Sequence, residues 1–452
     1  MKKIHDFKEK KILVLGLGKS GTSAAKLLKK LGADVQVNDA AETLALGLEE
    51  MGITVITGSH PLELLDGVEL LVKNPGIPYE NIMVTEAIKR QIPVWTDIEL
   101  AYRVSEAEII AITGTNGKTT TTSLIEEMFK QANKPAKVAG NIGIPASQVA
   151  EKVSSQETII MESSSFQLMG TEKFHPKIAI ITNIFSAHLD YHGSQEAYEV
   201  AKWKIQNNMI EDDFLILNLD QEKMLSYVSQ TRANVQVISL KKKTNAAYLL
   251  EGKIYYQEEY IMEADQLSLP GDHNLENALF ALTAAKLSGI ENQAICKALT
   301  TFTGKKHRLQ FLGKAQGRMA YNDTEATNIL ATQKALTGFD HKKVWLFIGG
   351  LDRGNSFDEL SDSLVDLKGM IIMGESSPKL VKLAESLQIP YHLTENVKTG
   401  LLEIFPQTEK GDILLLSPAC ASWDQYKNAA ERGDLFIETF ENLKLDSEKE
   451  MA

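Results

Sequence analysis

Short apolar runs that lead into glycine-rich turns recur along the chain. Residues 11–15 and 109–113 are mostly apolar, which predicts buried strands, and a turn with at least two glycines follows each run. After the second turn, Leu124, Ile125 and Met128 recur at helical spacing. Further strands are predicted at 34–38, 69–73, 158–161, 177–182 and 214–218. The alternation of buried strands and helices predicts an α/β fold with mostly parallel sheets.

The last third of the chain repeats this alternation. Strands are predicted at 344–348, 369–373 and 412–416, with helical patterns between them. Before them, Glu251-Gly252 separates two aliphatic and aromatic runs within 247–262, which predicts a hairpin. A length of 452 residues favours about three domains. We predict a Rossmann-like domain at 1–96, a central P-loop-type domain at 97–303 and a second Rossmann-like domain at 304–452.

Composition narrows the class of protein. The net charge is -12 and the pI is about 5.4, so no global field favours nucleic acid or an anionic membrane. Cys296 and Cys420 are the two cysteines, which argues against a disulfide framework or a cysteine zinc site. No apolar run approaches the roughly 20 residues of a membrane span. We expect a cytoplasmic monomer that binds neither nucleic acid nor membrane.

The stretch Gly114-Thr-Asn-Gly-Lys-Thr119 joins a predicted strand to a predicted helix. Backbone N–H groups in such a loop face one concavity, and the helix N-terminus adds a partial positive charge, so the context favours phosphate. Lys118 would contact the β- and γ-phosphates and Thr119 would bind Mg²⁺. The spacing departs from the full P-loop motif, because Ile112 stands where its first glycine belongs.

A second glycine motif lies near the N-terminus. Gly16-Leu-Gly18-Lys-Ser-Gly21 follows the first strand, and Asp39 ends the next strand, which is the dinucleotide fingerprint of a Rossmann unit. Any nucleoside diphosphate offers similar groups, so an NAD(P)-dependent oxidoreductase stays an alternative. The rigid loop Asn74-Pro-Gly-Ile-Pro78 follows a strand at the sheet edge where ligands bind.

Polar residues also follow the later strands. Glu162 ends a buried run, and a carboxylate in that position is suited to Mg²⁺. His188 and His192 are four residues apart, but Gly193 and the absent H-E-x-x-H pattern argue against a helical zinc pair. Alternatively, His188 and His192 are each a structural or a surface histidine. Lys202 lies in a helical segment of mixed character, and a lone lysine there would normally be exposed to solvent.

Taken in order and spacing, these motifs resemble the Mur ligases, and most closely the branch that adds D-glutamate. The resemblance covers nearly the whole chain. Its further motifs are Glu162-Ser-Ser-Ser-Phe-Gln-Leu168, Ala187-His-Leu-Asp-Tyr-His-Gly193, Gly271-Asp-His-Asn274-Leu-Glu-Asn277, His307-Arg308 and Ser417-Pro-Ala-Cys-Ala-Ser-Trp-Asp-Gln-Tyr426. The alanine-adding branch usually has histidine where Asn116 stands.

The resemblance implies an ATP-dependent acid–amino-acid ligase of peptidoglycan precursor synthesis. Such an enzyme joins D-glutamate to UDP-N-acetylmuramoyl-L-alanine through an acyl phosphate. The N-terminal domain would bind the UDP substrate, the central domain ATP, and the C-terminal domain the amino acid and part of ATP.

The resemblance also implies roles for single residues. The catalytic group would be Lys118, Glu162, His188 and Lys202. Two Mg²⁺ ions would be held by Thr119, Glu162, His188 and, if it is carbamylated, Lys202. ATP would contact Gly114, Thr115, Asn116, Gly117, Lys118, Thr119, Thr120, Asn277, Arg308 and Asp323. The UDP substrate would contact Gly18, Lys19, Ser20, Asp39, Asn74 and Asn141. D-Glutamate would lie near Thr327, Arg353 and Ser422.

One departure from the family pattern bears on the amino acid. The family usually has lysine where Glu325 stands, which changes the local charge by two units. At an effective dielectric of about 20, a charge about 6 Å away is worth on the order of 3 kcal/mol. The alternative is therefore a nucleotide-binding relative with altered amino-acid specificity or lost turnover.

Overall fold

The computed structural model describes residues 6–42, 47–185, 187–269, 271–354 and 356–451. Within these ranges no helix is both long enough and apolar enough to cross a membrane. The chain forms two compact units, the first of residues 1–266 with 276–300 and the second of residues 267–275 with 301–452. The domain boundaries at 96 and 303 stay predictions.

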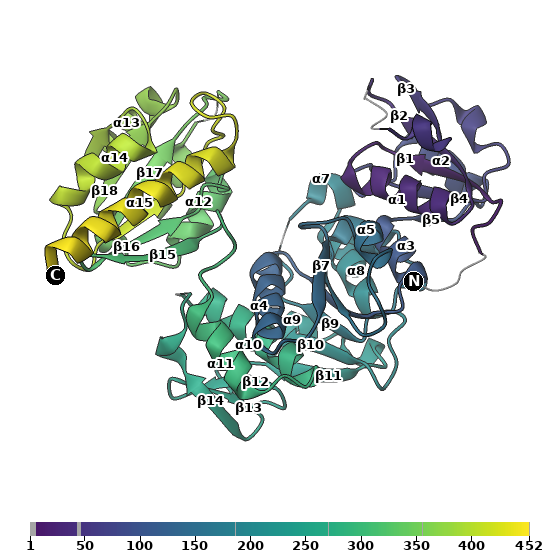
Figure 1. Ribbon diagram of the computed structural model, residues 1–452, viewed down its shortest axis with the longest axis horizontal. Helices are drawn as coiled ribbons and strands as arrows, with labels where there is room; N and C mark the ends of the chain where they lie inside the picture. The colour runs from purple at the N-terminus through teal and green to yellow at the C-terminus, as the bar shows by residue number, and fades with distance from the viewer. Residues whose placement is uncertain (1–5, 43–46, 186, 270, 355, 452) are drawn as a thin grey trace. The chain divides into compact units, whose positions relative to one another are not determined.

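The first sheet of unit 1 is parallel, in the order β3-β2-β1-β4-β5 (Figure 1). Side chains alternate along β1, with Ile12 and Val14 in one core cluster and Leu13 and Leu15 in another, so both faces are buried. The chain changes direction across the sheet at β1, where a ligand crevice forms in such folds. The elements are β1 (Lys11–Leu15), α1 (Lys19–Lys30), β2 (Asp34–Asp39), β3 (Thr54–Thr57), β4 (Leu70–Lys73), α2 (Ile82–Lys89) and β5 (Val94–Trp95).

The second sheet of unit 1 is also parallel, in the order β11-β10-β9-β6-β8-β7. The central strand β6 therefore lies at the second switch point, with the predicted phosphate loop at its carboxyl end. Its strands are β6 (Glu108–Thr113), β7 (Ala136–Gly140), β8 (Thr158–Glu162), β9 (Ile178–Ile181), β10 (Phe214–Asn218) and β11 (Asn234–Ile238).

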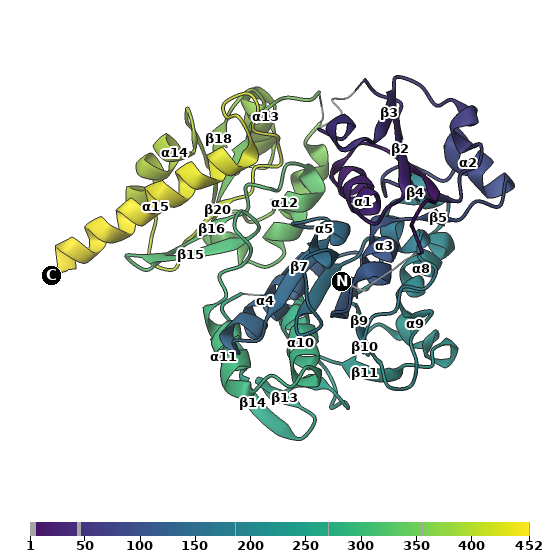
Figure 2. The ribbon, with the colours of Figure 1, turned by 45° about the vertical axis from the view of Figure 1, so that its right-hand side comes forward.

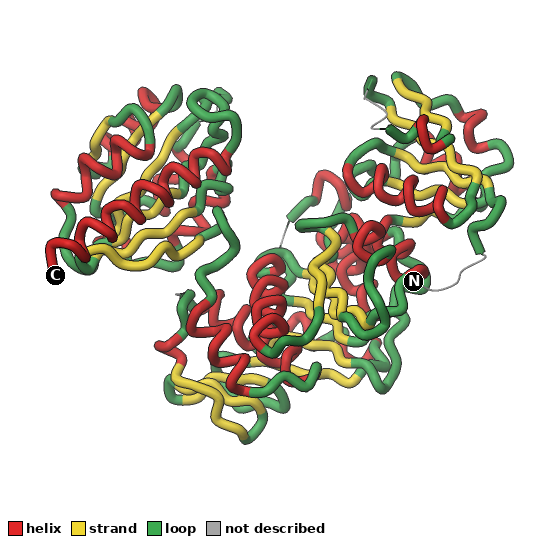
Figure 3. The backbone as a smooth tube through the Cα atoms, in the orientation of Figure 1, coloured by secondary structure: helices red, strands yellow, loops and turns green. Residues whose placement is uncertain are grey.

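Helices pack around the strands of this sheet (Figure 3). The two that bear on the site are α4 and α10, which lie side by side (Figures 1 and 2). The helices of this region are α3 (Asp97–Val104), α4 (Lys118–Gln131), α5 (Ala146–Ala150), α6 (Ser165–Met169), α7 (Leu189–His192), α8 (Gln195–Trp203), α9 (Glu222–Leu225), α10 (Asp272–Leu287) and α11 (Asn292–Thr301).

The predicted hairpin at 247–262 is wrong in extent, because the segment forms three antiparallel strands. They are β12 (Ala247–Leu250), β13 (Lys253–Tyr256) and β14 (Glu259–Glu263). The second turn places Gln257 at φ 54°, a conformation that glycine or asparagine usually takes. The sequence therefore carries no turn signal at that point.

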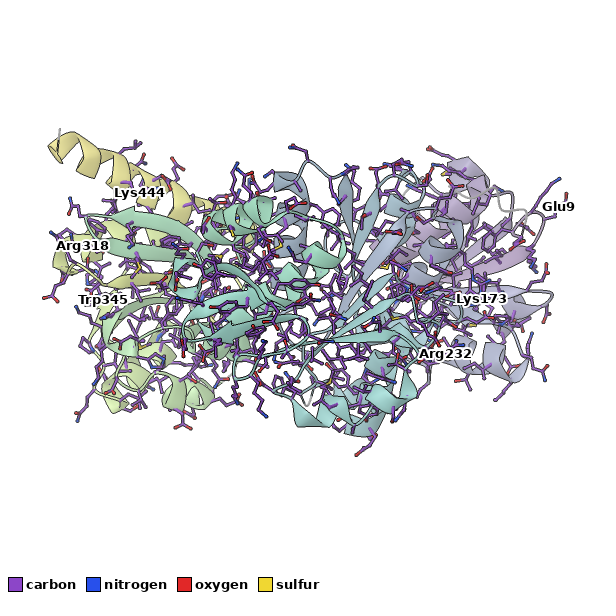
Figure 4. All side chains as sticks on the ribbon, turned by 90° about the horizontal axis from the view of Figure 1, so that it is seen from below. Glu9, Lys173, Arg232, Arg318, Trp345 and Lys444 are labelled. Carbon is purple, nitrogen blue, oxygen red and sulfur yellow. The ribbon has the colours of Figure 1, made fainter. Side chains whose placement is uncertain are left out.

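Unit 2 contains one sheet in the order β15-β16-β20-β17-β18-β19, parallel except for β15. Two core clusters lie on its two faces. Trp345 lies near one end of β17 (Figure 4). Its indole N–H donates to the Asp412 carboxylate at 3.1 Å. The elements are β15 (Gln310–Ala315), β16 (Arg318–Asn322), α12 (Ile329–Leu336), β17 (Val344–Gly349), β18 (Gly369–Met373), α13 (Ser377–Ser386), β19 (Tyr391–Leu393), α14 (Val397–Ile404), β20 (Ile413–Leu416) and α15 (Ala429–Met451).

Candidate active site

The loop between β6 and α4 has a backbone that requires glycine at two positions. Gly114 has φ 144° and Gly117 has φ 82°. A Cβ atom at Gly114 would collide with the Thr182 side chain, and one at Gly117 would collide with Asn277. The loop therefore lies closely against the end of β9 and against α10, and α4 begins at Lys118.

Asn183, two residues after the end of β9, holds the loop in place. Its side-chain oxygen accepts the Asn116 N–H at 2.8 Å, and its amide donates to the Asn116 carbonyl at 3.1 Å. Its carbonyl accepts the Thr115 N–H at 2.8 Å. Asn183 is not among the predicted site residues, although a polar residue at the end of a buried parallel strand is a signal for such a role.

Two lysine amines meet at one carbonyl beneath the loop. Lys118 Nζ donates to the carbonyls of Gly114 at 2.8 Å and Thr115 at 2.9 Å, and Lys202 Nζ donates to Gly114 at 2.7 Å. Lys202 is only 2% exposed. Burial, and after it the charge of Lys118, lowers the pKa of Lys202 to about 6. Lys202 is therefore mostly a neutral amine at pH 7 and not the solvated lysine of the alternative reading.

Glu162 ends β8 next to the same loop and is 1% exposed. One carboxylate oxygen accepts the Thr119 hydroxyl at 2.9 Å, and the other accepts the Asn141 amide at 2.9 Å. The structure thus brings together two predicted metal ligands and the residue predicted to meet the muramoyl group.

His188 is exposed, and its ring packs in an aromatic cluster with Phe166 and Tyr198. Its ring lies 5.0 Å from Phe166 and 6.2 Å from Tyr198, and Lys202 Nζ lies 4.7 Å from the Tyr198 ring. The His192 ring nitrogen lies 3.0 Å from the Ser165 hydroxyl, which suits a structural histidine. Across the described ranges, no group of three His, Cys, Asp or Glu residues surrounds a possible metal position.

Asn277 links α10 to the first turn of α4. Its side-chain oxygen accepts the Thr121 hydroxyl at 3.3 Å, and the residue is 5% exposed. Thr120 lies on the same first turn of α4. These contacts place Asn277 next to the phosphate loop, although more than a hundred and fifty residues separate them in sequence.

The N-terminal turn is organised by Asp39. Its two carboxylate oxygens accept the N–H groups of Leu17 at 2.7 Å and Ala41 at 2.9 Å. A Cβ atom at Gly18 would collide with the Asn74 side chain, so the turn and the loop after β4 touch. Lys19 and Ser20 form the start of α1 beside them. Asp39 therefore fixes the backbone of the turn through these two hydrogen bonds.

In unit 2, Asp323 follows β16. Its carboxylate accepts the Leu309 N–H at 3.0 Å and the Ser417 hydroxyl at 3.0 Å. Burial raises the pKa of Asp323 to about 7, against these hydrogen bonds and the nearby Arg308. Arg308 itself is exposed.

The predicted amino-acid residues also follow strand ends of unit 2. The Arg353 guanidinium lies 5.0 Å from the ring of Trp423, which is 65% exposed. The Ser422 hydroxyl is buried and has no hydrogen-bond partner within the described chain. Thr327 is half-buried, and Glu325 is exposed.

Arg432 on α15 is not among the predicted site residues. Its guanidinium is 1% exposed and donates to the hydroxyl and carbonyl of Thr324 at 2.9 and 3.0 Å and to the Cys420 carbonyl at 3.1 Å. A weaker bond reaches the Gly349 carbonyl at 3.4 Å. Arg432 thus ties together the loops after β16 and β20 and the last residue of β17, and no local motif marks it.

Two family models and many full-length relatives match the chain. Residues 10–96 match the N-terminal domain of MurD-like Mur ligases, and residues 112–285 match the Mur ligase middle domain. The UDP-N-acetylmuramoylalanine--D-glutamate ligase of Lactococcus lactis subsp. cremoris is 61% identical, over 98% of this chain and 100% of that one. The enzyme of the same name from Enterococcus faecalis is 53% identical, over 98% of this chain and 99% of that one.

Solved structures show the same fold. The UDP-N-acetylmuramate-alanine ligase MurC of Thermotoga maritima has a TM-score of 0.56 at 19% identity, covering 96% of this chain and 99% of that chain. The MurF ligase of the same organism, solved in complex with ADP, has a TM-score of 0.56 at 16% identity, covering 98% and 96%. Family matches, full-length relatives and the three-domain α/β fold agree, and the chain belongs to the Mur ligase family, in its MurD-like branch.

Proposed function

We propose that the protein is an ATP-dependent ligase that joins D-glutamate to UDP-N-acetylmuramoyl-L-alanine in cytoplasmic peptidoglycan precursor synthesis. The observation that carries the proposal is the group of Lys118, Thr119, Glu162 and Lys202 around one glycine loop. The half-buried amine of Lys118, which would bind phosphate, lies there with the buried carboxylate of Glu162 and the buried amine of Lys202. Full-length relatives that carry this activity in their names support the choice of substrates.

A carboxylate is too poor an electrophile for an amine, so the reaction needs activation. The substrate carboxylate attacks the γ-phosphorus of ATP, and ADP leaves. The amine of D-glutamate then attacks the acyl carbon and phosphate leaves. Lys118 and the loop N–H groups would hold the transferring phosphoryl group and stabilise the charge that develops on it.

Mg²⁺ would be held by Glu162 and the Thr119 hydroxyl, which lie 2.9 Å apart. This donor set fits the ion, because Mg²⁺ prefers carboxylates and takes its other ligands from phosphates and water. The ion would supply charge neutralisation between the two anionic substrates. His188 would provide a ligand for a second ion.

Lys202 would complete that second site as a carbamate. A neutral amine and CO₂ form a carbamate and release one proton, so the side chain becomes an anionic, carboxylate-like ligand. A pKa of about 6 keeps the Lys202 amine neutral at pH 7 and available to CO₂. Burial of the residue would protect the carbamate from water.

The remaining roles follow the resemblance. Gly18, Lys19, Ser20, Asp39 and Asn74 would bind the UDP group, and Asn141 would meet the muramoyl part. Asn277, Arg308 and Asp323 would contact ATP, and Thr327, Arg353 and Ser422 the D-glutamate. The buried hydroxyl of Ser422 has no hydrogen-bond partner among the described residues, which suits a residue that bonds a ligand.

A phosphate-release assay tests the proposal. Release should require ATP, UDP-N-acetylmuramoyl-L-alanine and D-glutamate together. Release with L-lysine or L-alanine but not with D-glutamate would overturn the assigned amino acid. Tight binding of both substrates without release, recovered by Glu325→Lys, would favour the alternative of lost turnover.

A further inference from the structure

Lys73, at the end of β4, is a buried lysine that no motif singled out. It is 1% exposed. Its amine donates to the carbonyls of Ile77 at 2.8 Å and Pro75 at 3.3 Å, and to the Tyr191 hydroxyl at 3.2 Å. It also lies 4.7 Å from the centroid of the Tyr79 ring. None of these partners is a carboxylate, so the buried charge depends on the geometry of these dipoles.

Tyr191 engages the same loop. Its hydroxyl lies 3.0 Å from the Ile77 carbonyl and 3.3 Å from the Pro75 carbonyl. Its ring packs against Phe166 at 4.3 Å, and Phe166 packs against His188 at 5.0 Å. A continuous series of contacts therefore leads from the loop 74–78 to the aromatic cluster around His188.

That series extends to the phosphate loop. The His188 ring lies 6.2 Å from Tyr198, and the Tyr198 hydroxyl lies 3.0 Å from the Thr115 hydroxyl. The Lys202 amine lies over the same Tyr198 ring. The loop after β4 and the loop after β6 are thus joined by packed side chains of unit 1.

Both polar groups are in the protonation state that this contact needs. Burial lowers the pKa of Lys73 to about 8, with Glu80 opposing the shift, so the amine is mostly charged at pH 7. Burial raises the pKa of Tyr191 to about 12, so its hydroxyl keeps its proton. Each group is a hydrogen-bond donor facing backbone carbonyls.

We propose that Lys73 and Tyr191 are positioning residues for the ligase reaction, which hold the loop 74–78 against the segment 187–193 that carries His188. The inference rests on the proposed function. Lys73 is too deeply buried to touch a substrate, so it acts through the residues that it fixes. Removing Lys73 frees both the loop that begins at Asn74, the residue that the UDP group would contact, and the segment of His188.

The test compares Lys73→Met, Tyr191→Phe and the double variant with the wild type at 25 °C. We expect kcat for phosphate release to fall about tenfold in Lys73→Met, because small misplacements of reacting groups cost that much or more. Titration of Lys73→Met with UDP alone should give a Kd that is several-fold larger than that of the wild type. Tyr191→Phe should change both quantities in the same direction, by less. The double variant should be no worse than Lys73→Met, because the two groups serve one contact.

Lys134→Met is the control, and it removes a lysine–carbonyl contact at an exposed position. Its amine donates to the Ser288 and Gly289 carbonyls at 2.6 and 3.0 Å, the same kind of bond away from both loops. It should keep the wild-type kcat and UDP affinity. A purely structural role would lower the melting temperature of Lys73→Met and leave kcat and Kd unchanged, which overturns the inference.

Two further outcomes also overturn it: effects of the single variants that multiply in the double, or a Tyr191→Phe variant with wild-type values. If Lys73→Met does not fold, Tyr191→Phe decides alone. A wild-type protein that releases no phosphate contradicts the proposed function instead, and the UDP titration still tests the positioning contact.

Discussion

The two glycine loops of unit 1 share a design and differ in what lies beneath them. Each follows the strand at a switch point of a parallel sheet, and each leads into a helix that begins at a lysine, Lys19 in α1 and Lys118 in α4. Under the second loop lie a buried carboxylate and a buried amine, Glu162 and Lys202. The acid of the first loop, Asp39, instead accepts the N–H groups of its own turn.

This difference indicates that one loop only binds a ligand, whereas the other also takes part in the reaction. A glycine turn at a helix N-terminus favours a phosphate group in either sheet. Charges placed in a water-excluded site act more strongly on a transition state than the same charges in water. We infer that the first loop holds a nucleoside diphosphate and that the second also stabilises phosphoryl transfer.

Replacing the lysine at the start of each helix by alanine gives the largest expected effect on kcat. Lys118→Ala should lower kcat for phosphate release by about 10²–10³-fold, since it removes one preorganised charge from the transferring group. Lys19→Ala should keep kcat and raise KM for the UDP substrate. The measurement is phosphate release at saturating ATP and D-glutamate. Equal loss of kcat in both variants would erase the distinction between the loops.

Carbamylation of Lys202 gives the next effect. Lys202→Ala should lose at least ~10²-fold in turnover, because even changes in groups behind a metal ligand cost 10–100-fold. Wild-type protein kept free of CO₂ should lose activity and regain it with bicarbonate, and the variant should not respond. A carbamate carbon signal in NMR after labelling with ¹³C-bicarbonate should be present in the wild type and in Lys19→Ala. Its absence from both would refute the carbamate.

The pH dependence of stability measures the buried amine directly. With a pKa of about 6 when folded and 10.5 as the reference, Lys202 binds less proton in the folded than in the unfolded chain between these values. The unfolding free energy of the wild type should therefore rise with pH relative to Lys202→Met, by up to about 1.4 kcal/mol per pH unit. Denaturation in CO₂-free buffer at pH 6.5 and 8.5 checks this. Lys19→Met, at an exposed position, should follow the wild type; a flat difference for Lys202→Met would contradict the burial.

Glu325 gives the smallest effect, at a position outside either loop. Its side chain is exposed, so solvent screens it, and the loss estimated for a close charge should not occur. Glu325→Lys should lower KM for D-glutamate by about two- to fivefold. A change beyond about a hundredfold would mean that the side chain faces the substrate.

Much of this fold follows from local pattern. The strand at 11–15 has the predicted bounds, and the run before Gly114 and the strand ending near Glu162 differ by one residue. Buried parallel strands carry a dense apolar signal, and the glycine turns mark their carboxyl ends. The α/β class with three domains was predictable for the same reason.

Other features depend on contacts that are distant in sequence. β15 and β16 carry lysine, glutamine and arginine, and we had not predicted them as strands. Lys73 and Arg432 are buried cations whose partners are mostly backbone carbonyls, and a carbonyl has no sequence signature. The neutral state of Lys202 likewise arises from burial, which a single lysine in a mixed helix does not reveal.

Transfer of oxygen from the substrate to phosphate tests the central claim most directly. UDP-N-acetylmuramoyl-L-alanine labelled with ¹⁸O in its free carboxylate is converted with ATP and D-glutamate, and the released phosphate is analysed by mass spectrometry. Attack of the carboxylate on the γ-phosphorus predicts one ¹⁸O atom in each phosphate released. Phosphate without label, released together with the amide product, would contradict phosphoryl transfer to the carboxylate at the loop of Lys118.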